Sequence, residues 1–489
     1  MENLIGRTKE LAILERLVNS QKAELLAIYG RRRIGKTFLI SKFFKERGLY
    51  FEMTGVKDGS IQQQLKAFTS CLKRAFRSTD LSKPPTDWFE ALELLQNGVE
   101  KHKSSEKIIL FFDELPWMET HKSDLIKAFE FAWNSFFSID PRVITILCGS
   151  SVSWMVKKII HNKGGLHGRL TAQIRLRPFS LEETESFFLA NQIHLDRKQI
   201  AEIYMAIGGI PKYLSYVEPG KSAPQNIQSL CFDSGGPLTI EFDSLYESLF
   251  DNHQAHAKII ELLAQKRVGL SFSQISQYTN ISIGGSLSKT LRELLASDFV
   301  QFIPFYGKKK REGKYRLTDE YSLFYLSWIK DSVYNYDESL SSSYWIRQQA
   351  TSKYRAWSGY VFENLCFKHI RQIIEELKLS VVAEGAAYWS HISKEREKNG
   401  RGAQIDLIID RSDQCMNLCE LKFLNSEYTL NEEKHNILNN RREIFRKETK
   451  TKKTLFNTMI TPYGVKNNSY YLSSVDQQLK LDALFKPIR

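Results

Sequence analysis

The sequence predicts an α/β fold in which a parallel sheet with a helical lid is followed by two further domains. Three observations predict it. Apolar, strand-like runs in the first third of the chain end in glycine, acidic or hydroxyl residues. A helical apolar pattern with a basic hairpin tip follows, and two more strand-like runs near the C-terminus carry acidic residues. Since 489 residues exceed what one core supports, we expect domains at 1–235, 236–335 and 336–489.

The composition is that of an ordinary globular protein. With 42% hydrophobic and 26% charged residues, neither a disordered nor a fibrous chain fits. The net charge of +13 favours an acidic partner, usually nucleic acid, although solvated lysines would give the same charge. No signal-peptide core and no membrane-spanning apolar run is apparent, and the cysteines are scattered. We therefore expect a cytoplasmic protein without a membrane partner.

The first strand-like run leads into a glycine loop. Residues 30–37 read Gly-Arg-Arg-Arg-Ile-Gly-Lys-Thr, with an apolar run at 25–29 before them and helical apolar spacing at 38–44 after them. Strand, glycine loop and helix form a unit that wraps a polyphosphate with backbone N–H groups and the helix N-terminus. Lys36 would reach the terminal phosphates and Thr37 would offer its hydroxyl to Mg²⁺. The expected nucleotide contacts of this loop are Gly30, Arg33, Gly35, Lys36 and Thr37.

Two further strand-like runs end in candidate catalytic residues. One ends in Asp113, expected to hold Mg²⁺ through its water shell, and Glu114, expected to orient and deprotonate the attacking water. The other ends beside Ser150, whose hydroxyl either contacts the γ-phosphate or attacking water or simply terminates the strand. Arg169 could supply positive charge to the transition state, from the same chain or from a neighbour in a homo-oligomer, or be a surface arginine.

Two short motifs complete the nucleotide-binding pattern. Gly6 and Arg7 lie just ahead of the first strand, and Gly209-Ile210-Pro211 follows a helical segment. With the glycine loop and the Asp-Glu strand they resemble the AAA-like and STAND group of ATPases, specifically the archaeal and bacterial ATPase family. The resemblance implies ATP as the nucleotide, an adenine pocket at Gly6 and Arg7, and a turn at Pro211 that couples nucleotide state to the lid. No Asn-Lys-x-Asp guanine motif is apparent.

The middle of the chain predicts a winged helix-turn-helix. Helical apolar spacing from His256, a capped helix at 271–278 and a second helix from Leu287 lead to a strand pair with a basic tip at 307–313. The tip lysines could grip phosphates while a helix enters a DNA groove. A solvated turn, or a hinge module beside the ATPase, is the alternative.

The last pair of strand-like runs predicts a cluster of charged side chains. The runs flank a turn centred near Asp413, so that a hairpin brings Asp406 opposite Glu420. Alternation along the strand then places Lys422 on the same face as Glu420. Asp406 and Glu420 could hold one or two Mg²⁺ ions against a scissile phosphate, while Lys422 stabilises or helps deprotonate the attacking water.

An upstream helical segment adds Glu363 as a candidate further carboxylate. The Asp…Glu-x-Lys pattern with this helix resembles the PD-(D/E)xK nuclease superfamily, and more closely the C-terminal domain that follows this ATPase family in many prokaryotic proteins. A basic stretch from Arg441 to Lys453 could line a nucleic-acid channel or be a solvated helix face. The first interpretation is an ATPase coupled to a nuclease-like domain acting on nucleic acid, with DNA as the favoured form. The alternatives are a signalling ATPase with a recognition domain and an ATP-responsive DNA-binding regulator.

Overall fold

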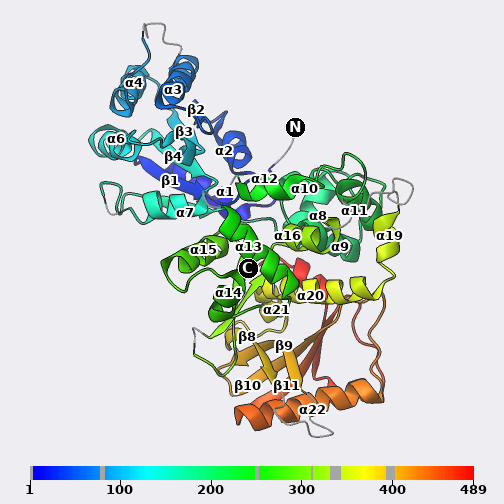
Figure 1. Cartoon of the computed structure of the whole chain (residues 1–489). Helices are drawn as coiled ribbons and strands as arrows, with labels where there is room; N and C mark the ends of the chain where they lie inside the picture. Colours follow the sequence, from blue (N-terminus) through cyan, green and yellow to red (C-terminus); the bar gives the residue numbers. More distant parts are fainter. Residues whose placement is uncertain are drawn as a thin grey trace. The chain divides into compact units, whose positions relative to one another are not determined.

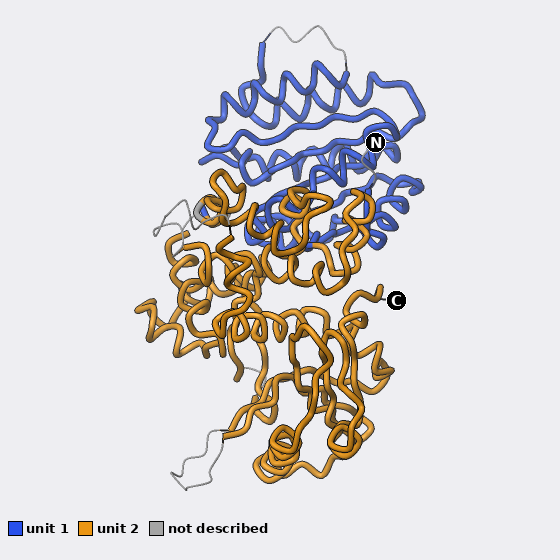
Figure 2. Tube along the Cα trace, turned by 90° about the vertical axis from the view of Figure 1, so that its right-hand side faces the viewer, with its two compact units in different colours: residues 1–178, 247–251 blue, residues 179–246, 252–489 orange. Residues whose placement is uncertain are grey.

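The computed structural model contains two compact units, which Figure 2 colours separately. Unit 1 comprises Met1–Pro178 with Glu247–Asp251, and unit 2 comprises Phe179–Tyr246 with Asn252–Arg489. The structure describes residues 4–76, 83–162, 164–247, 253–309, 312–330, 343–391 and 402–488. No helix in these ranges is long and apolar enough to cross a membrane.

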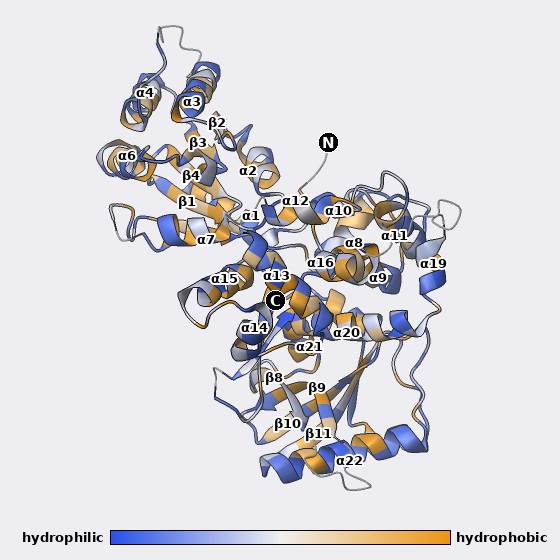
Figure 3. Ribbon diagram, viewed as in Figure 1, coloured by the Kyte–Doolittle hydropathy of each residue, from blue (hydrophilic) through white to orange (hydrophobic). Residues whose placement is uncertain are grey.

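Unit 1 is built on a five-stranded parallel sheet in the order β2-β3-β4-β1-β5 (Figure 1). The strands are nearly continuous apolar runs, as expected for a sheet that is buried on both faces. Figure 3 shows their hydrophobic colouring. The strands are β1 (Glu24–Tyr29), β2 (Gly48–Thr54), β3 (Lys107–Asp113), β4 (Val143–Gly149) and β5 (Ala172–Arg175).

Helices cover this sheet. Phe51, Phe68, Trp88 and Phe112 form the centre of a core between β2, β3 and helices α3 and α4. The carboxyl ends of β1, β3 and β4 lie at one edge, where α/β sheets bind ligands. The helices are α1 (Thr8–Asn19), α2 (Lys36–Phe44), α3 (Ile61–Phe76), α4 (Trp88–Lys101), α5 (Leu115–Met118), α6 (Leu125–Ala132), η1 (Trp133–Phe137), α7 (Val152–Met155) and η2 (Val156–Ile160).

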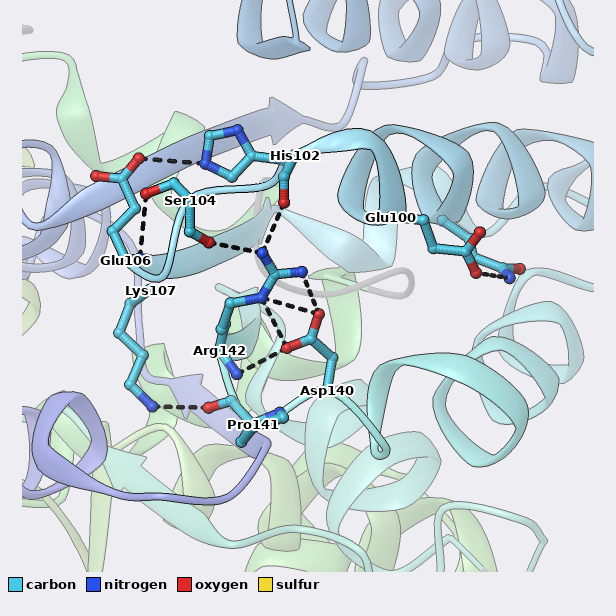
Figure 4. A network of polar contacts seen from close by, with 9 residues as sticks. Glu100, His102, Ser104, Glu106, Lys107, Asp140, Pro141 and Arg142 are labelled. Atoms are coloured by element: carbon cyan, nitrogen blue, oxygen red, sulfur yellow. Dashed lines mark hydrogen bonds and ion pairs between the residues drawn. The ribbon is translucent and has the colours of Figure 1, made fainter.

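Arg142 ties together the segments that enter β3 and β4 (Figure 4). Its guanidinium pairs with Asp140 at 2.6 Å and donates to the carbonyl oxygens of His102 and Ser104 at 2.6 and 2.7 Å. Lys107 adds a bond of 2.8 Å to the carbonyl oxygen of Pro141. The network lies at the start of both strands, at the opposite end from Asp113, and so anchors the sheet without reaching the candidate site.

Replacing Arg142 with Ala is expected to destabilise unit 1 by about 1–3 kcal/mol, because the partners of a charged donor are left without it. Hydrogen bonds from Arg142 lower the pKa of Asp140. Their stabilisation is therefore present above the usual pKa of an aspartate and is lost as pH falls through the lower, folded value. Urea unfolding at neutral and acidic pH measures both effects. Equal stabilities of Arg142→Ala and the native chain at neutral pH would contradict the anchoring role.

Unit 2 begins with a group of helices. Phe179, the first residue of unit 2, packs against the Gly-x-Pro turn. Its backbone N donates to Gly209 O at 2.7 Å, and Tyr204 Oη donates to Phe179 O at 2.7 Å. A Cβ on Gly209 would collide with that same carbonyl oxygen. The helices are α8 (Leu181–Ala190), α9 (Arg197–Ile207), α10 (Pro211–Leu214), α11 (Ala223–Cys231) and α12 (Glu241–Glu247).

The middle region has the predicted succession of helices and hairpin. Ser271 caps α14 by accepting from Gln274 N, with Gln274 completing the capping box. Of the predicted basic tip, Lys310 and Arg311 lie outside the described residues. The elements are α13 (His253–Gln265), α14 (Phe272–Thr279), α15 (Gly285–Ala296), antiparallel β6 (Val300–Pro304) and β7 (Gly313–Leu317), α16 (Glu320–Phe324) and η3 (Tyr325–Ile329).

The C-terminal region holds a mixed sheet in the order β12-β11-β10-β9-β8, with β8, β9 and β10 antiparallel and β10, β11 and β12 parallel. In Figure 1, α22 runs across the strands of this sheet. The elements are α19 (Tyr344–Gln348), α20 (Ser352–Lys368), α21 (Ile370–Glu376), β8 (Ala383–His391), β9 (Ala403–Arg411), β10 (Cys415–Leu421), α22 (Glu432–Thr449), β11 (Thr454–Thr461), α23 (Ser469–Ser474), β12 (Gln477–Lys480) and η4 (Leu481–Phe485).

The β6–β7 hairpin packs on this sheet. Phe305 forms a parallel bridge with Tyr388 of β8, and Tyr306 N donates to Tyr388 O at 3.0 Å. Arg316 of β7 is buried and pairs with Glu363 of α20 at 2.9 Å. The α/β class and the parallel sheet are thus confirmed. The hairpin is part of a larger packed region, which the sequence did not indicate.

Candidate functional site

The glycine loop of unit 1 connects β1 to α2 as predicted. Gly35 has φ +86°, a conformation that residues with a Cβ rarely adopt, and it precedes Lys36 at the start of α2. Lys36 is buried, and its Nζ donates to the carbonyl oxygens of Gly30 and Arg31 at 3.0 and 3.1 Å. The carbonyl oxygens of the loop therefore hold the ammonium group, which can exchange these acceptors for phosphate oxygens. Arg33, also in the loop, is exposed with φ +66°.

Gly30→Ala is expected to be more disruptive than Gly35→Ala. A Cβ on Gly30 would fall inside van der Waals contact of Leu176 O, whereas nothing lies within 4 Å of a Cβ on Gly35. Gly35→Ala carries only the left-handed penalty, about 1–2 kcal/mol. Gly30→Ala also displaces the segment that continues β5, and should lower the melting temperature further and abolish ATP binding. Thermal unfolding and fluorescent-nucleotide titration compare the two variants, and equal melting temperatures would contradict this reasoning.

Thr37 and Asp113 meet at the carboxyl edge of the sheet. Thr37 Oγ1 donates to Asp113 Oδ2 at 2.7 Å, and Asp113 is 3% exposed. A hydroxyl and a carboxylate that already converge are the hard oxygen ligands that Mg²⁺ takes beside a nucleotide. The donor set therefore fits a magnesium ion.

Glu114 and Ser150 are joined directly. Glu114 Oε2 accepts from Ser150 Oγ at 2.7 Å and from Ser150 N at 3.0 Å. Glu114 has φ +49°, which turns its carboxylate toward the tip of β4. The sequence predicted both residues at the site but not this contact, since it joins the ends of two strands that are neighbours only in the folded sheet.

The remaining nucleotide candidates are distributed over both units. Gly6 and Arg7 have φ +65° and +58°, and Arg7 donates to Ile34 O at 3.2 Å and to Arg177 O at 2.7 Å. Arg7 thus braces the glycine loop. Arg169 is exposed, and its side chain forms no hydrogen bond or ion pair within the described ranges. Pro211 begins α10 in unit 2.

Unit 2 brings together Asp406, Glu420 and Lys422. Strands β9 and β10 pair in the register Cys419↔Leu407, so the next step places Glu420 opposite Asp406. Lys422 Nζ pairs with Glu420 Oε1 at 2.6 Å. Asp406 is 7% exposed, and its Oδ2 accepts from Leu421 N at 3.3 Å. This arrangement matches the one expected from a turn centred at Asp413.

Charge and burial shift the pKa values of Asp406 and Glu420 in opposite directions. Burial raises the pKa of Asp406, and the charges of Glu420 and Glu363 raise it further. Burial alone would also raise the pKa of Glu420, but the charges of Arg441 and Lys422 outweigh it and lower this pKa. Arg441 of α22 pairs with Glu420 Oε2, a contact that the sequence did not predict.

Glu363 is engaged elsewhere in the structure. Its Oε2 accepts from Arg316 Nη2 at 2.9 Å, and it affects Asp406 through its charge. Within the described ranges, no group of three or more His, Cys, Asp or Glu side chains is arranged to hold a metal ion. Asp406 and Glu420 remain a pair of hard oxygen donors that fits a divalent cation once Glu420 exchanges one of its two basic partners.

Residues 4–217 match the sequence model of a protein family described as an ATPase domain predominantly from Archaea. Within that range lie the glycine loop, the Thr37–Asp113 pair and the Glu114–Ser150 pair. The N-terminal domain of this chain belongs to that ATPase family. This ATPase domain therefore binds and hydrolyses ATP, as predicted.

Individual proteins are similar to this chain over different lengths. An uncharacterized protein of Methanocaldococcus jannaschii is 25% identical over 406 residues, 83% of each chain. An uncharacterized ATP-binding protein of the same organism is 51% identical over 43 residues, 9% of this chain and 73% of its own. The Walker-type ATPase of Pyrococcus abyssi is 19% identical with a TM-score of 0.46, over 66% of this chain and 96% of the other.

Proposed function

We propose that this ATPase couples its nucleotide state to a metal-dependent, PD-(D/E)xK-like nuclease domain that acts on nucleic acid, most readily DNA. The observation that carries the proposal is the opposition of Asp406 and Glu420 in β9 and β10, with Lys422 paired to Glu420. Burying charged side chains in otherwise apolar strands is costly unless they are paired, and buried charged clusters with shifted pKa values are typical of functional sites. The net charge of +13 suits a polyanionic substrate.

At the ATPase site, Thr37 and Asp113 would hold Mg²⁺, which would neutralise charge developing on the phosphates. Lys36 exchanges its loop carbonyl oxygens for phosphate oxygens. Glu114 is the base: it leaves Ser150, accepts a proton from the attacking water and orients that water for in-line attack. Ser150 would then be free to contact the nucleotide and report its state. Arg169, being exposed and unpaired in the described ranges, would act on the site of a neighbouring copy.

At the C-terminal site, Asp406 and Glu420 would hold a divalent cation, which would polarise a phosphodiester. Lys422 lies beside Glu420 with its side chain 39% exposed, so that it can contact an incoming phosphate or hold the attacking water. Glu363, fixed by Arg316, positions charge near Asp406. Gly6, Arg7 and Pro211 would serve as adenine-pocket and lid-turn residues.

A second candidate is an ATP-responsive module that recognises nucleic acid without cleaving it. It is favoured by the occupation of both Glu420 oxygens by Lys422 and Arg441. In this alternative the middle helices form a winged helix-turn-helix. Its hairpin packs on β8, so that contact with DNA would come from α14, α15 or the hairpin tip.

Incubation with DNA or RNA, with and without Mg²⁺ and ATP, tests the proposal. Metal-dependent cleavage that ATP alters is the expected result. Salt-sensitive binding without cleavage would support the recognition module instead. Failure to bind or cut either nucleic acid, with normal ATP turnover, would refute both and leave a signalling ATPase.

A further inference from the structure

Helix α22 directs an arginine at the C-terminal site. Leu438 and Phe445 bury their side chains in separate apolar clusters of the sheet, the first with Tyr428 and Met459, the second with Trp389. Arg441 lies three residues after Leu438 and four before Phe445, and so on the same face of the helix. It is 7% exposed, and both flanking anchors fix its backbone against the sheet.

The guanidinium of Arg441 is only partly satisfied. Its Nη1 donates to Glu420 Oε2 and, at 3.2 Å, to Gln404 O. Its Nη2 is buried and has no hydrogen-bond partner among the described residues. A buried donor without an acceptor costs about 1–3 kcal/mol. An acceptor that brought its own negative charge would remove this cost, and a phosphate offers two oxygens in the geometry of the guanidinium fork.

The surroundings favour a polyanion as the source of that acceptor. The exposed side of the same helix presents Arg446 and Lys447 beside Glu443 and Glu448, and Figure 3 shows α22 as mostly hydrophilic with hydrophobic bands. Lys422, which pairs with the other oxygen of Glu420, is partly exposed, so this group of charges reaches the protein surface. A phosphodiester backbone crossing this region would meet positive charge on both sides of Glu420.

We propose that Arg441 is a further phosphate-binding residue of this site and exchanges Glu420 for a phosphate oxygen of nucleic acid. The exchange rests on the proposed function. It satisfies Nη2 and releases one oxygen of Glu420, which then faces Asp406 as an unpaired carboxylate oxygen. Before substrate arrives, Arg441 pairs with the Glu420 oxygen that a cation would need, so the site stays closed to metal. Substrate and cation therefore bind with positive coupling.

The test measures cation and DNA binding, not cleavage. Mn²⁺ affinity is determined by calorimetry in the full chain, with the heat that persists in Asp406→Asn assigned to other sites. Binding of a short DNA duplex is measured in EDTA across a salt series. Arg441→Gln is expected to raise Mn²⁺ affinity about 5- to 150-fold. It should also reduce the salt slope of DNA binding by about one.

Two variants serve as controls. Lys447→Gln removes one exposed charge from the same helix and should leave Mn²⁺ affinity unchanged. Arg441→Lys keeps the charge and should restore the salt slope. Unchanged Mn²⁺ affinity and an unchanged salt slope in Arg441→Gln would overturn the inference. The proposed function would still stand in that case if the native chain binds DNA. A native chain that binds no DNA would refute the proposed function and the phosphate exchange together.

The native chain supplies a measurement that no folding defect can affect. Saturation with the DNA duplex is expected to raise its Mn²⁺ affinity several-fold, since linkage is reciprocal. An equal Mn²⁺ affinity with and without bound DNA would overturn the exchange.

Discussion

Glu114→Gln is expected to bind ATP normally and to lose about 10²–10⁴-fold in turnover, the usual contribution of a general base. The amide keeps the shape of the side chain and can still face Ser150, so the tip of β4 should retain its structure. It cannot accept a proton from water. Nucleotide titration and steady-state phosphate release separate the two effects.

Ser150→Ala is the matched control for Glu114→Gln. It removes the hydroxyl that donates to Glu114 and leaves the backbone N–H bond in place. We expect a smaller loss of turnover than in Glu114→Gln, because the base itself survives. Normal turnover in Glu114→Gln would show that another group activates the water. Loss of ATP binding in that variant would show that Glu114 is needed to bind the nucleotide and would contradict a role limited to activating the water.

Asp406→Asn is expected to abolish metal-dependent cleavage, by at least about 100-fold, while ATP turnover by unit 1 continues. The amide is nearly isosteric and can still accept from Leu421 N. It cannot supply the negative charge that a divalent cation requires. A fluorescent-substrate assay in Mg²⁺, run beside phosphate release on the same preparation, measures both activities.

Asp410→Asn provides the comparison for Asp406→Asn on the same strand. Asp410 pairs with Lys453 at 2.6 Å, away from Glu420, so its loss should affect local stability and not cleavage. Equal cleavage by native chain and Asp406→Asn would remove Asp406 from the reaction. Equal losses in the two variants would point to the stability of β9 as the cause.

Much of the fold was predictable because its signals are local. The apolar runs before Gly30, Asp113 and Ser150 are strands, since a sheet buried on both faces needs such runs. The opposition of Asp406 and Glu420 followed from one turn and the alternation of strand side chains. Each of these inferences uses residues close together in sequence.

The contacts that were missed join distant segments. Arg316 pairs with Glu363, which is 47 residues away in the sequence, and Arg441 pairs with Glu420, which is 21 residues away. A weak signal existed for Arg441, because it occupies an apolar position of α22 between Leu438 and Phe445. As part of a basic stretch, it was expected either to line a nucleic-acid channel or to lie on a solvated helix face. The packing of Phe305 against Tyr388 had no comparable signal, since both read as ordinary strand residues.

The bridge between Phe305 and Tyr388 bears on how this chain can be divided. Strand β8 ends the C-terminal sheet, and the hairpin covers part of its outer backbone. A fragment beginning at residue 336 would expose that backbone to pairing with other copies, and would leave Glu363 without Arg316. Such a fragment is expected to aggregate through this exposed strand edge. The smallest fragment expected to stay soluble on its own is therefore the sheet together with its hairpin.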